Sequence, residues 1–422
     1  MAYYGLLVYI VLLIIRPGDW VPWVLGWPLE LVVAGTTWAV ALLKTRDNRG
    51  QPGSAFYMLI AGWVTAVFLS DLLNGLFDLA IDRTIICFKL SMVLVLFWLV
   101  VDSINKLRGV ATMLAVLAGV LGLQGIYMIQ HGVGWAGQDM YWGGRIRWVG
   151  LWDGANVLSL VFVTAFPFIL ELFFGRWGLS GKLIAVASGA LTLTGLYLAN
   201  SRGGYLALAV TMLVFFRHRI GWKGVIIAAL LIAVVFSVGP SRLAELEGSD
   251  KSARNRVDMW AEGLEMLKYN PVFGIGKGEF GSYTGTLIAH NTFIETMGET
   301  GFVGLFFYIG LIYVAFKCLF HVLRVSEKLS PRLVSLTQAL LASLIAYLSA
   351  SMFISTDFEP IYLLMGLSAA VFRMASQAQG VRLSFEFGLI DVAAVGARVD
   401  GAGGQLIYEN VTSYENAFRK HH

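Results

Sequence analysis

The residues of this sequence best suited to chemistry are a few arginines and one histidine beside long apolar segments. The first is Arg202, in the stretch Asn200-Ser201-Arg202-Gly203-Gly204, which separates two apolar runs with almost no loop. An arginine in such a place is costly unless it snorkels to the interface, pairs, or lines a wet cavity. Interfacial snorkelling is the ordinary alternative, and the other interpretation is that Arg202 binds an anion at a membrane boundary.

Two further arginines, Arg254 and Arg256, stand at the start of an amphipathic pattern over residues 254–268. Val257, Trp260, Leu264 and Leu267 fall on one helical face, and Asn270-Pro271 ends the predicted helix. Cations in the first turn of a helix oppose its dipole. An anionic partner for these arginines is therefore one expectation, and a solvated charged turn is the alternative.

The histidine of interest is His290, which opens the segment HNTFIETMGETGFVG. Asn291 follows it directly, and Glu295 and Glu299 come later, at the boundary of an apolar run. A single histidine at such a boundary is often structural. Histidine is also the side chain that most readily accepts a proton near neutral pH, so His290 is a candidate general base.

Other polar residues give weaker signals. Arg145 and Arg147 precede GLWDGANVLSL, where Asn156 enters an apolar run; they bind phosphate or simply anchor the loop. Asp357, in STDFEP, orients a base or caps a helix. The glycine-rich stretch 274–278 is not preceded by a strand, and we interpret it as a flexible turn. The sequence contains no Asp-x-Asp pair and no His/Cys cluster with metal-ligand spacing, so neither a metal nor another cofactor is expected.

The elements that must position these residues are membrane-spanning helices. Of the 422 residues, 57% are apolar and only 14% are charged, and the mean hydropathy is +0.71. A soluble domain would need more polar surface, and a membrane β-barrel would show short alternating segments. We therefore expect an all-α polytopic membrane protein. The net charge of +4 is sorted by loop rather than pooled in one patch, and no nucleic-acid partner is expected.

About twelve spans are predicted, and every second connection between them is basic. The spans are 3–15, 29–43, 55–73, 84–101, 108–130, 154–174, 182–199, 203–216, 221–238, 301–320, 335–354 and 360–373. Because Lys and Arg gather in cytoplasmic loops, both termini are expected inside. We divide the chain into a membrane domain, residues 1–374, and a cytoplasmic tail, residues 375–422. One large outer loop, 239–300, lies between the ninth and tenth spans.

Four stretches resemble the O-antigen ligase and polymerase superfamily of bacterial membrane glycosyltransferases. They are RWVGLWDGANVLSLVFVTAFP (147–167), SRGGYLALAV (201–210), RNRVDMWAEGLEMLKYNPVFGIGKGEF (254–280) and HNTFIETMGETGFVGLFFYIG (290–310). Their order, the number of spans and the long loop before the histidine match the family pattern. The likeness covers residues 140–375, and the first part of the chain matches only as generic spanning helices.

The resemblance implies a GT-C-type fold in the bacterial inner membrane. It implies transfer of a glycan from undecaprenyl pyrophosphate, on the periplasmic face and without metal, to an acceptor hydroxyl of a glycan or of lipid A-core. We favour an O-antigen ligase because one loop carries both Arg256 and His290. An O-antigen or exopolysaccharide polymerase and a protein O-oligosaccharyltransferase are the alternatives within the family. A glycolipid transporter is the alternative from another class.

Roles carry over residue by residue. Arg202 and Arg256 match the family's arginines and would bind the pyrophosphate, with Arg254 as the alternative loop arginine and with Arg145 and Arg147 as helpers. His290 matches the loop histidine and would be the base. A supporting role is expected for Asn291, Glu299, Asn156 and Asp357. Attack opposite the leaving group would invert the configuration of the sugar.

Overall fold

The structure is a computed structural model in which most of the chain is described. The described backbone comprises residues 1–44, 54–220, 223, 226, 246–285, 287–355, 359–379, 381–386, 389–394, 398–399 and 406–407. The predicted ninth span, 221–238, lies almost wholly outside the described residues, and so does Asp357.

The described chain is overwhelmingly helical, and the other eleven predicted spans each coincide with a helix. These helices are α1 (Ala2–Ile15), α2 (Leu29–Lys44), α3 (Ser54–Leu73), α4 (Phe77–Val100), α5 (Ile104–His131), α6 (Ala155–Phe174), α7 (Gly178–Ala199), α8 (Arg202–Ile220), α12 (Thr292–Arg324), α13 (Pro331–Ser351) and α14 (Glu359–Gln379). Short 3₁₀ turns η1 (Pro17–Asp19), η2 (Gly150–Trp152) and η4 (Ser326–Lys328) lie between them.

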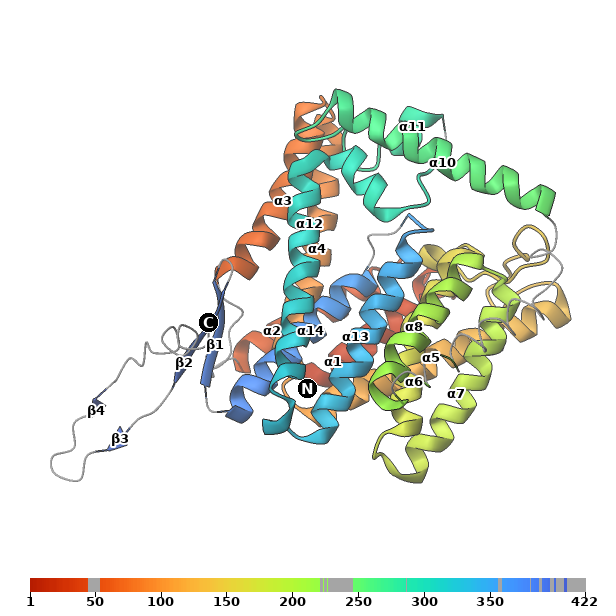
Figure 1. The fold of residues 1–422 in the computed structure, drawn as a ribbon. Coiled ribbons are helices and arrows are strands. Elements are labelled where there is room, and N and C mark those ends of the chain that lie inside the picture. The colour runs from red at the N-terminus through yellow and green to blue at the C-terminus, as the bar shows by residue number, and fades with distance from the viewer. Residues whose placement is uncertain are drawn as a thin grey trace.

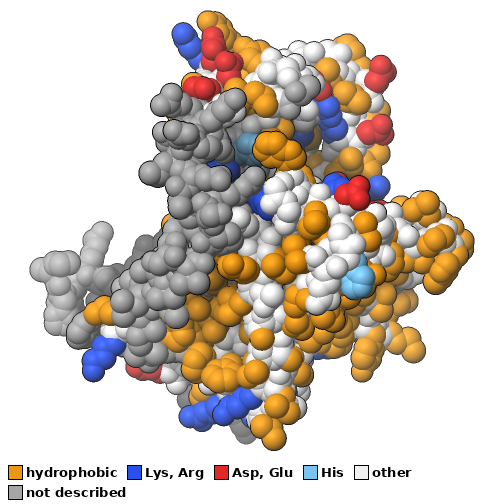
Figure 2. Space-filling view, turned by 90° about the vertical axis from the view of Figure 1, so that its right-hand side faces the viewer, with side chains coloured by type: hydrophobic (Ala, Val, Ile, Leu, Met, Phe, Trp, Pro, Cys, Tyr) orange, Lys and Arg blue, Asp and Glu red, His pale blue; other side chains and the backbone are white. Residues whose placement is uncertain are grey.

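Eight of the described helices are long and apolar enough to cross a membrane: α3 to α7 and α12 to α14. The helices α1 and α2 are apolar but shorter. The expected fold class, an all-α polytopic membrane protein, is therefore confirmed. On the face drawn in Figure 2, hydrophobic side chains cover the middle of the molecule, and charged side chains gather at its two ends. This distribution suits a bilayer around the middle of the bundle.

Two helices lie outside the bundle. The helix α10 (Leu246–Tyr269) and the short α11 (Phe280–Thr284) lie across one end of it, at the top of Figure 1. We call this the α10 end. Here α10 packs on α12, and α12 packs in turn on α3, α13 and α14. The predicted amphipathic helix over 254–268 therefore exists, but it begins earlier, at Leu246.

The sequence predicted a helix that starts near His290 and Asn291 and runs into the span at 301–320, and α12 begins at Thr292 in agreement with this. The sequence did not predict the break in α12 at Gly301, which has φ 64°. The peptide N–H groups of Phe302 and Val303 donate to the carbonyls of Pro271 and Val272, at 2.9 and 3.2 Å. The chain that follows α10 thus pairs with the break in α12, and it fixes the α10 end to the bundle.

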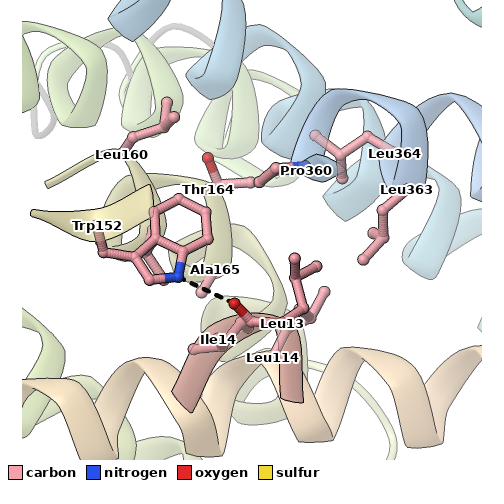
Figure 3. A pocket seen from close by; sticks show the side chains of 11 residues that line it. Leu13, Ile14, Leu114, Trp152, Leu160, Thr164, Ala165, Pro360, Leu363 and Leu364 are labelled. Atoms are coloured by element: carbon pink, nitrogen blue, oxygen red, sulfur yellow. Dashed lines mark hydrogen bonds between the residues drawn. The ribbon is translucent and has the colours of Figure 1, made fainter. Parts of the chain in front are cut away.

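A small apolar cavity of about 30 Å³ marks the centre of the packing (Figure 3). Its walls include Leu13, Leu114, Trp152, Leu160, Pro360 and Leu364. The indole Nε1 of Trp152 donates to the carbonyl of Leu13 at 3.1 Å. A space of this size and polarity stays dry. The cavity is a packing feature, and the tryptophan fastens the loop before α6 to α1.

The C-terminal segment contains short strands that the sequence did not predict. β1 (Val381–Glu386) pairs antiparallel with β2 (Leu389–Ala394), and β3 (Arg398–Val399) pairs with β4 (Leu406–Ile407). The helix α14 runs five residues beyond the domain boundary predicted at 374. The cytoplasmic placement of this tail stays a prediction.

Candidate functional site

His290 is held at the junction between the α10 layer and the bundle. Its backbone adopts a left-handed conformation, φ 48°, which is uncommon for a residue with a side chain. On one side, Trp260 Nε1 of α10 donates to the carbonyl of Ala289 at 3.1 Å. On the other, the buried Asn291 caps α12 by accepting two backbone N–H groups of its first turn. The expected support from Asn291 is therefore a helix cap that orients the histidine's backbone.

Arg256 lies on the face of α10 that turns toward the bundle. This face also carries Trp260, Gly263 and Met266, and the last two are buried against Ile294 of α12 and its surroundings. Of the four residues on the predicted apolar face, Trp260 and Leu267 are half-buried, whereas Val257 and Leu264 are 61% and 54% exposed. The two exposed residues are free to meet lipid or solvent. Arg256 itself is half-buried, on the helix face that also anchors the chain before His290.

Arg202 begins α8 at a tight turn that follows α7. Asn200 ends α7 in a left-handed conformation, and Ser201 Oγ accepts the backbone N–H of Gly204 at 3.2 Å. A Cβ on Gly204 would lie 2.8 Å from Ser159 Oγ, so a glycine at this position allows α8 to approach α6 closely. The side chain of Arg202 is exposed. The turn thus presents a cation at a helix N-terminus, a common place for anion binding.

Electrostatics join these three residues. Burial lowers the pKa of the Arg256 guanidinium, and the neighbouring Arg202 lowers it further. Burial also lowers the pKa of His290, with Arg256 as the second cause. Because such influence reaches about 10 Å, Arg202 lies near Arg256, and Arg256 lies near His290, at the α10 end. We call them the Arg–His group.

Arg145 supports the turn that carries Arg202. Its Nε donates to the carbonyl of Ala199 at 2.8 Å, and its Nη2 donates to Asn156 Oδ1 at 2.7 Å. These bonds connect the loop before α6 to the last residue of α7. The structure places Arg145 and Asn156 beside the Arg–His group as anchors of its scaffold.

Arg147 is engaged elsewhere. Its Nη1 pairs with Asp153 at 3.0 Å, and its Nε donates to the carbonyl of Asp139 at 2.7 Å. The side chain of Arg254, like Asp357, lies outside the described residues, so only Arg256 of the two candidate loop arginines has a described side chain.

Within the described part of the chain, no three His, Cys, Asp or Glu side chains are grouped to hold a metal ion.

Glu299 belongs to a second set of charged residues, which the sequence did not reveal. Its buried carboxylate pairs with Lys277 Nζ at 2.8 Å. Asp71 accepts the backbone N–H of Lys277 at 2.6 Å and lies 3.4 Å from Arg83 Nη1. Arg83 Nη2 bonds Glu279 at 2.6 Å, and this bond lowers the pKa of Glu279. We call these five residues the carboxylate-paired cluster.

The carboxylate-paired cluster fixes the glycine-rich stretch 274–278. The backbone N–H of Gly276 donates to the carbonyl of Glu299 at 3.0 Å, and Asn74 Nδ2 donates to the carbonyl of Gly274 at 2.8 Å. The stretch is a turn, as predicted, but it is fastened to α3 and α12 rather than flexible. The only signal in the sequence was a set of opposite charges near span ends, on segments far apart in the chain.

Fold and site together define a class. The chain is a multi-pass membrane protein with a cation-rich Arg–His group at one end of its bundle, beneath an amphipathic helix. Residues 187–309 match the family model described as O-antigen ligase. The predicted resemblance to that superfamily is therefore confirmed over this segment, which includes Arg202, Arg256 and His290 but not Arg145 or Arg147. No curated protein matches the chain.

Proposed function

We propose that this protein is a glycosyltransferase that moves a glycan from undecaprenyl pyrophosphate to an acceptor hydroxyl, most simply as an O-antigen ligase acting on lipid A-core. The observation that carries the proposal is the grouping of Arg202, Arg256 and His290 at the α10 end. In this proposal the α10 end faces the periplasm of a bacterial inner membrane, and both termini lie in the cytoplasm. The family match over 187–309 supports a membrane glycosyltransferase of this type.

Arg202 and Arg256 form the pyrophosphate clamp. Burial is the main cause of the lowered pKa of Arg256, and repulsion from the neighbouring Arg202 guanidinium adds to it. A bound diphosphate would relieve this repulsion through bidentate, charge-assisted hydrogen bonds. Because negative charge grows on the pyrophosphate as it leaves, the clamp stabilises the transition state more than the ground state.

His290 acts as the general base. Its pKa lies below the usual value, so the imidazole is neutral near pH 7 and can accept a proton. The acceptor hydroxyl oxygen attacks the anomeric carbon, and its proton passes to His290. The bond between that carbon and the phosphate oxygen breaks, and the pyrophosphate leaves with the electron pair. Attack from the opposite face inverts the configuration of the sugar.

The test is transfer by the purified protein, with EDTA present, from a defined undecaprenyl-pyrophosphate glycan to candidate acceptors. We expect a product of inverted anomeric configuration, with no ion gradient and no added cofactor. Tight binding of the donor without transfer to a glycan, lipid A-core or protein hydroxyl would refute the proposal and favour a glycolipid transporter.

Ligase, polymerase and protein O-oligosaccharyltransferase share this donor chemistry and differ in the acceptor. Deletion of the gene separates the first two. Long chains that remain on the lipid carrier indicate a lost ligase, whereas single repeat units on the final acceptor indicate a lost polymerase. Loss of glycan from protein alone indicates the third activity.

A further inference from the structure

A polar pocket of about 440 Å³ lies between the end of α1 and the loop that precedes α6. The residues that line it include Arg16, Asp19, Gln138, Arg147, Trp148 and Asp153. We call it the Arg147 pocket. Its volume is within the range of about 300–1,000 Å³ that is typical of small-molecule sites. It contains none of the Arg–His group and none of the carboxylate-paired cluster.

The polar side chains of the Arg147 pocket are already held in place. Arg16 pairs with Asp19, and Arg147 pairs with Asp153 at 3.0 Å. Gln138 Oε1 accepts the backbone N–H of Ala136 at 3.0 Å. All four charged side chains remain partly exposed, between 19% and 50%. They can therefore bond a ligand without first losing side-chain freedom, which lowers the cost of binding.

The backbone around the pocket is shaped for this arrangement. Arg16 has φ 52° and Gly150 has φ 60°, both in the left-handed region. A Cβ on Gly150 would lie 2.1 Å from Asp19 Oδ2. Beneath, the indoles of Trp20 and Trp148 both donate to the carbonyl of Ile15, at 3.1 and 3.2 Å. The left-handed Arg16 ends α1, and the glycine at position 150 leaves room for the Arg16–Asp19 pair.

A second polar side chain, Gln124, lies close to the pocket residue Gln138. Gln124 of α5 is fully buried, and its amide has no hydrogen-bond partner among the described residues. Gly134 brings this amide close to that of Gln138, since a Cβ there would lie within 2.5 Å of both side-chain nitrogens. A buried amide without a partner is rare and calls for a water or ligand. This observation is independent of the two ion pairs.

The Arg147 pocket and the Arg–His group are connected by a short stretch of chain that carries both Arg147 and Arg145. Along residues 145–148, burial alternates: Ile146 and Trp148 are buried, whereas the side chains of Arg145 and Arg147 are only partly buried. This alternation places both arginines on one side of an extended stretch, about 7 Å apart. Arg145 holds the last residue of α7, next to Arg202. A ligand in the Arg147 pocket would thus lie beside the scaffold of the proposed pyrophosphate clamp.

The charges of the pocket identify the class of ligand. Two guanidinium groups and two carboxylates balance each other, so a phosphate would meet two anions. A neutral ligand with many hydroxyls suits the pocket, because each hydroxyl can donate to a carboxylate and accept from a guanidinium or amide. We propose that the Arg147 pocket binds one sugar residue of a glycan substrate. The proposal rests on the proposed function for its choice of substrate.

The test measures sugar binding without transfer. Purified His290→Ala protein in nanodiscs is mixed with the delipidated repeat unit of the donor or, separately, with the acceptor saccharide, and binding is followed by saturation-transfer NMR. We expect one of the two saccharides to bind, and Asp153→Ala to weaken it about tenfold, as expected for a lost hydrogen bond to a charged group. The saccharide that responds shows whether the pocket takes donor or acceptor.

Matched variants keep the result interpretable. Asp139→Ala changes an exposed carboxylate of the same loop that does not line the pocket, and it should leave binding unchanged. Asp153→Asn retains the shape of the side chain and should still weaken binding. In the otherwise unchanged protein, Asp153→Ala should raise KM for the same saccharide while kcat stays within twofold.

The proposal is overturned if Asp153→Ala and Asp153→Asn bind both saccharides as well as the parent does. It is also overturned if Asp139→Ala weakens binding as much as they do, because the loop would then act only as a whole. Saccharide binding that depends on Asp153, together with an absence of transfer by the protein that retains His290, would uphold the pocket and reject the proposed function.

Discussion

The α10 end of the molecule contains two groups of charged residues that resemble each other in the sequence and differ in the structure. In the carboxylate-paired cluster, Arg83 and Lys277 face Asp71, Glu279 and Glu299 at 2.6–3.4 Å. In the Arg–His group, burial lowers the pKa of both Arg256 and His290, and a neighbouring arginine lowers each pKa further. Balanced charges hold the fold together. Charges of one sign, kept close to each other, are suited to a ligand of the opposite sign.

The largest effect expected from this contrast is at His290. The His290→Ala variant should lose transfer by about 10²–10⁴-fold, since His290 is the group proposed to accept the hydroxyl proton. The steady-state rate is measured with purified protein and a saturating donor. His131→Ala serves as the control, because His131 is exposed and stacked on Tyr127, at 4.0 Å between the rings. Equal rates for the two variants would reassign the base.

The next effect separates the two groups directly. Arg202→Lys and Arg256→Lys should each reduce transfer by about 10²–10³-fold, because an ammonium group cannot supply paired, bidentate bonds to a phosphate. Arg83→Lys, in the carboxylate-paired cluster, should change transfer only a few-fold. Full activity of both clamp variants would mean that these arginines merely anchor the chain at the interface.

Substitutions in the carboxylate-paired cluster should lower the stability of the protein rather than its transfer activity. Glu299→Gln leaves the ammonium of Lys277 without its carboxylate and should cost about 3 kcal/mol, as is usual for a broken buried pair. The double variant with Lys277→Met should recover part of this loss. Thermal melting in detergent measures both. Asp102→Asn breaks an exposed pair with Lys106, and it should cost about 0–1 kcal/mol. Equal melting temperatures for Glu299→Gln and the parent protein would show that the cluster does not support the fold.

The smallest effect is a shift with pH. Because the pKa of His290 is below 6.5, the neutral base persists as the pH falls past 6.5, and kcat/KM should decline only at lower pH. Arg256→Gln removes one cause of the lowering, so the pKa of His290 should rise. NMR titration of labelled histidine, assigned by comparison with His290→Ala, measures the change. A downward shift would show that Arg256 does not act on His290.

The fold class and the positions of most helices could be predicted from the sequence, because a helix that crosses lipid needs a long apolar run. What the sequence did not predict is the break in α12 at Gly301, where backbone N–H groups donate to the carbonyls of Pro271 and Val272. Those contacts join segments about thirty residues apart. No hydropathy pattern indicates them.

The candidate site was predicted in part. The sequence and the family resemblance predicted that Arg202, Arg256 and His290 share one site, and their roles in it stay a prediction. Glu299 was expected to support them, but its partner Lys277 lies in a stretch interpreted as a flexible turn. Arg147 was expected as a helper, yet it pairs with Asp153 in another pocket. An isolated charge in a sequence does not indicate whether it is balanced in space.

The central claim is that cations of the Arg–His group, rather than those of the carboxylate-paired cluster, bind the diphosphate. The direct measurement is the affinity of undecaprenyl pyrophosphate, without a glycan, for purified protein in nanodiscs that contain EDTA. We predict that Arg256→Gln weakens binding about tenfold or more and that Arg83→Gln leaves it unchanged. Unchanged binding in Arg256→Gln, or a loss confined to Arg83→Gln, would contradict the account.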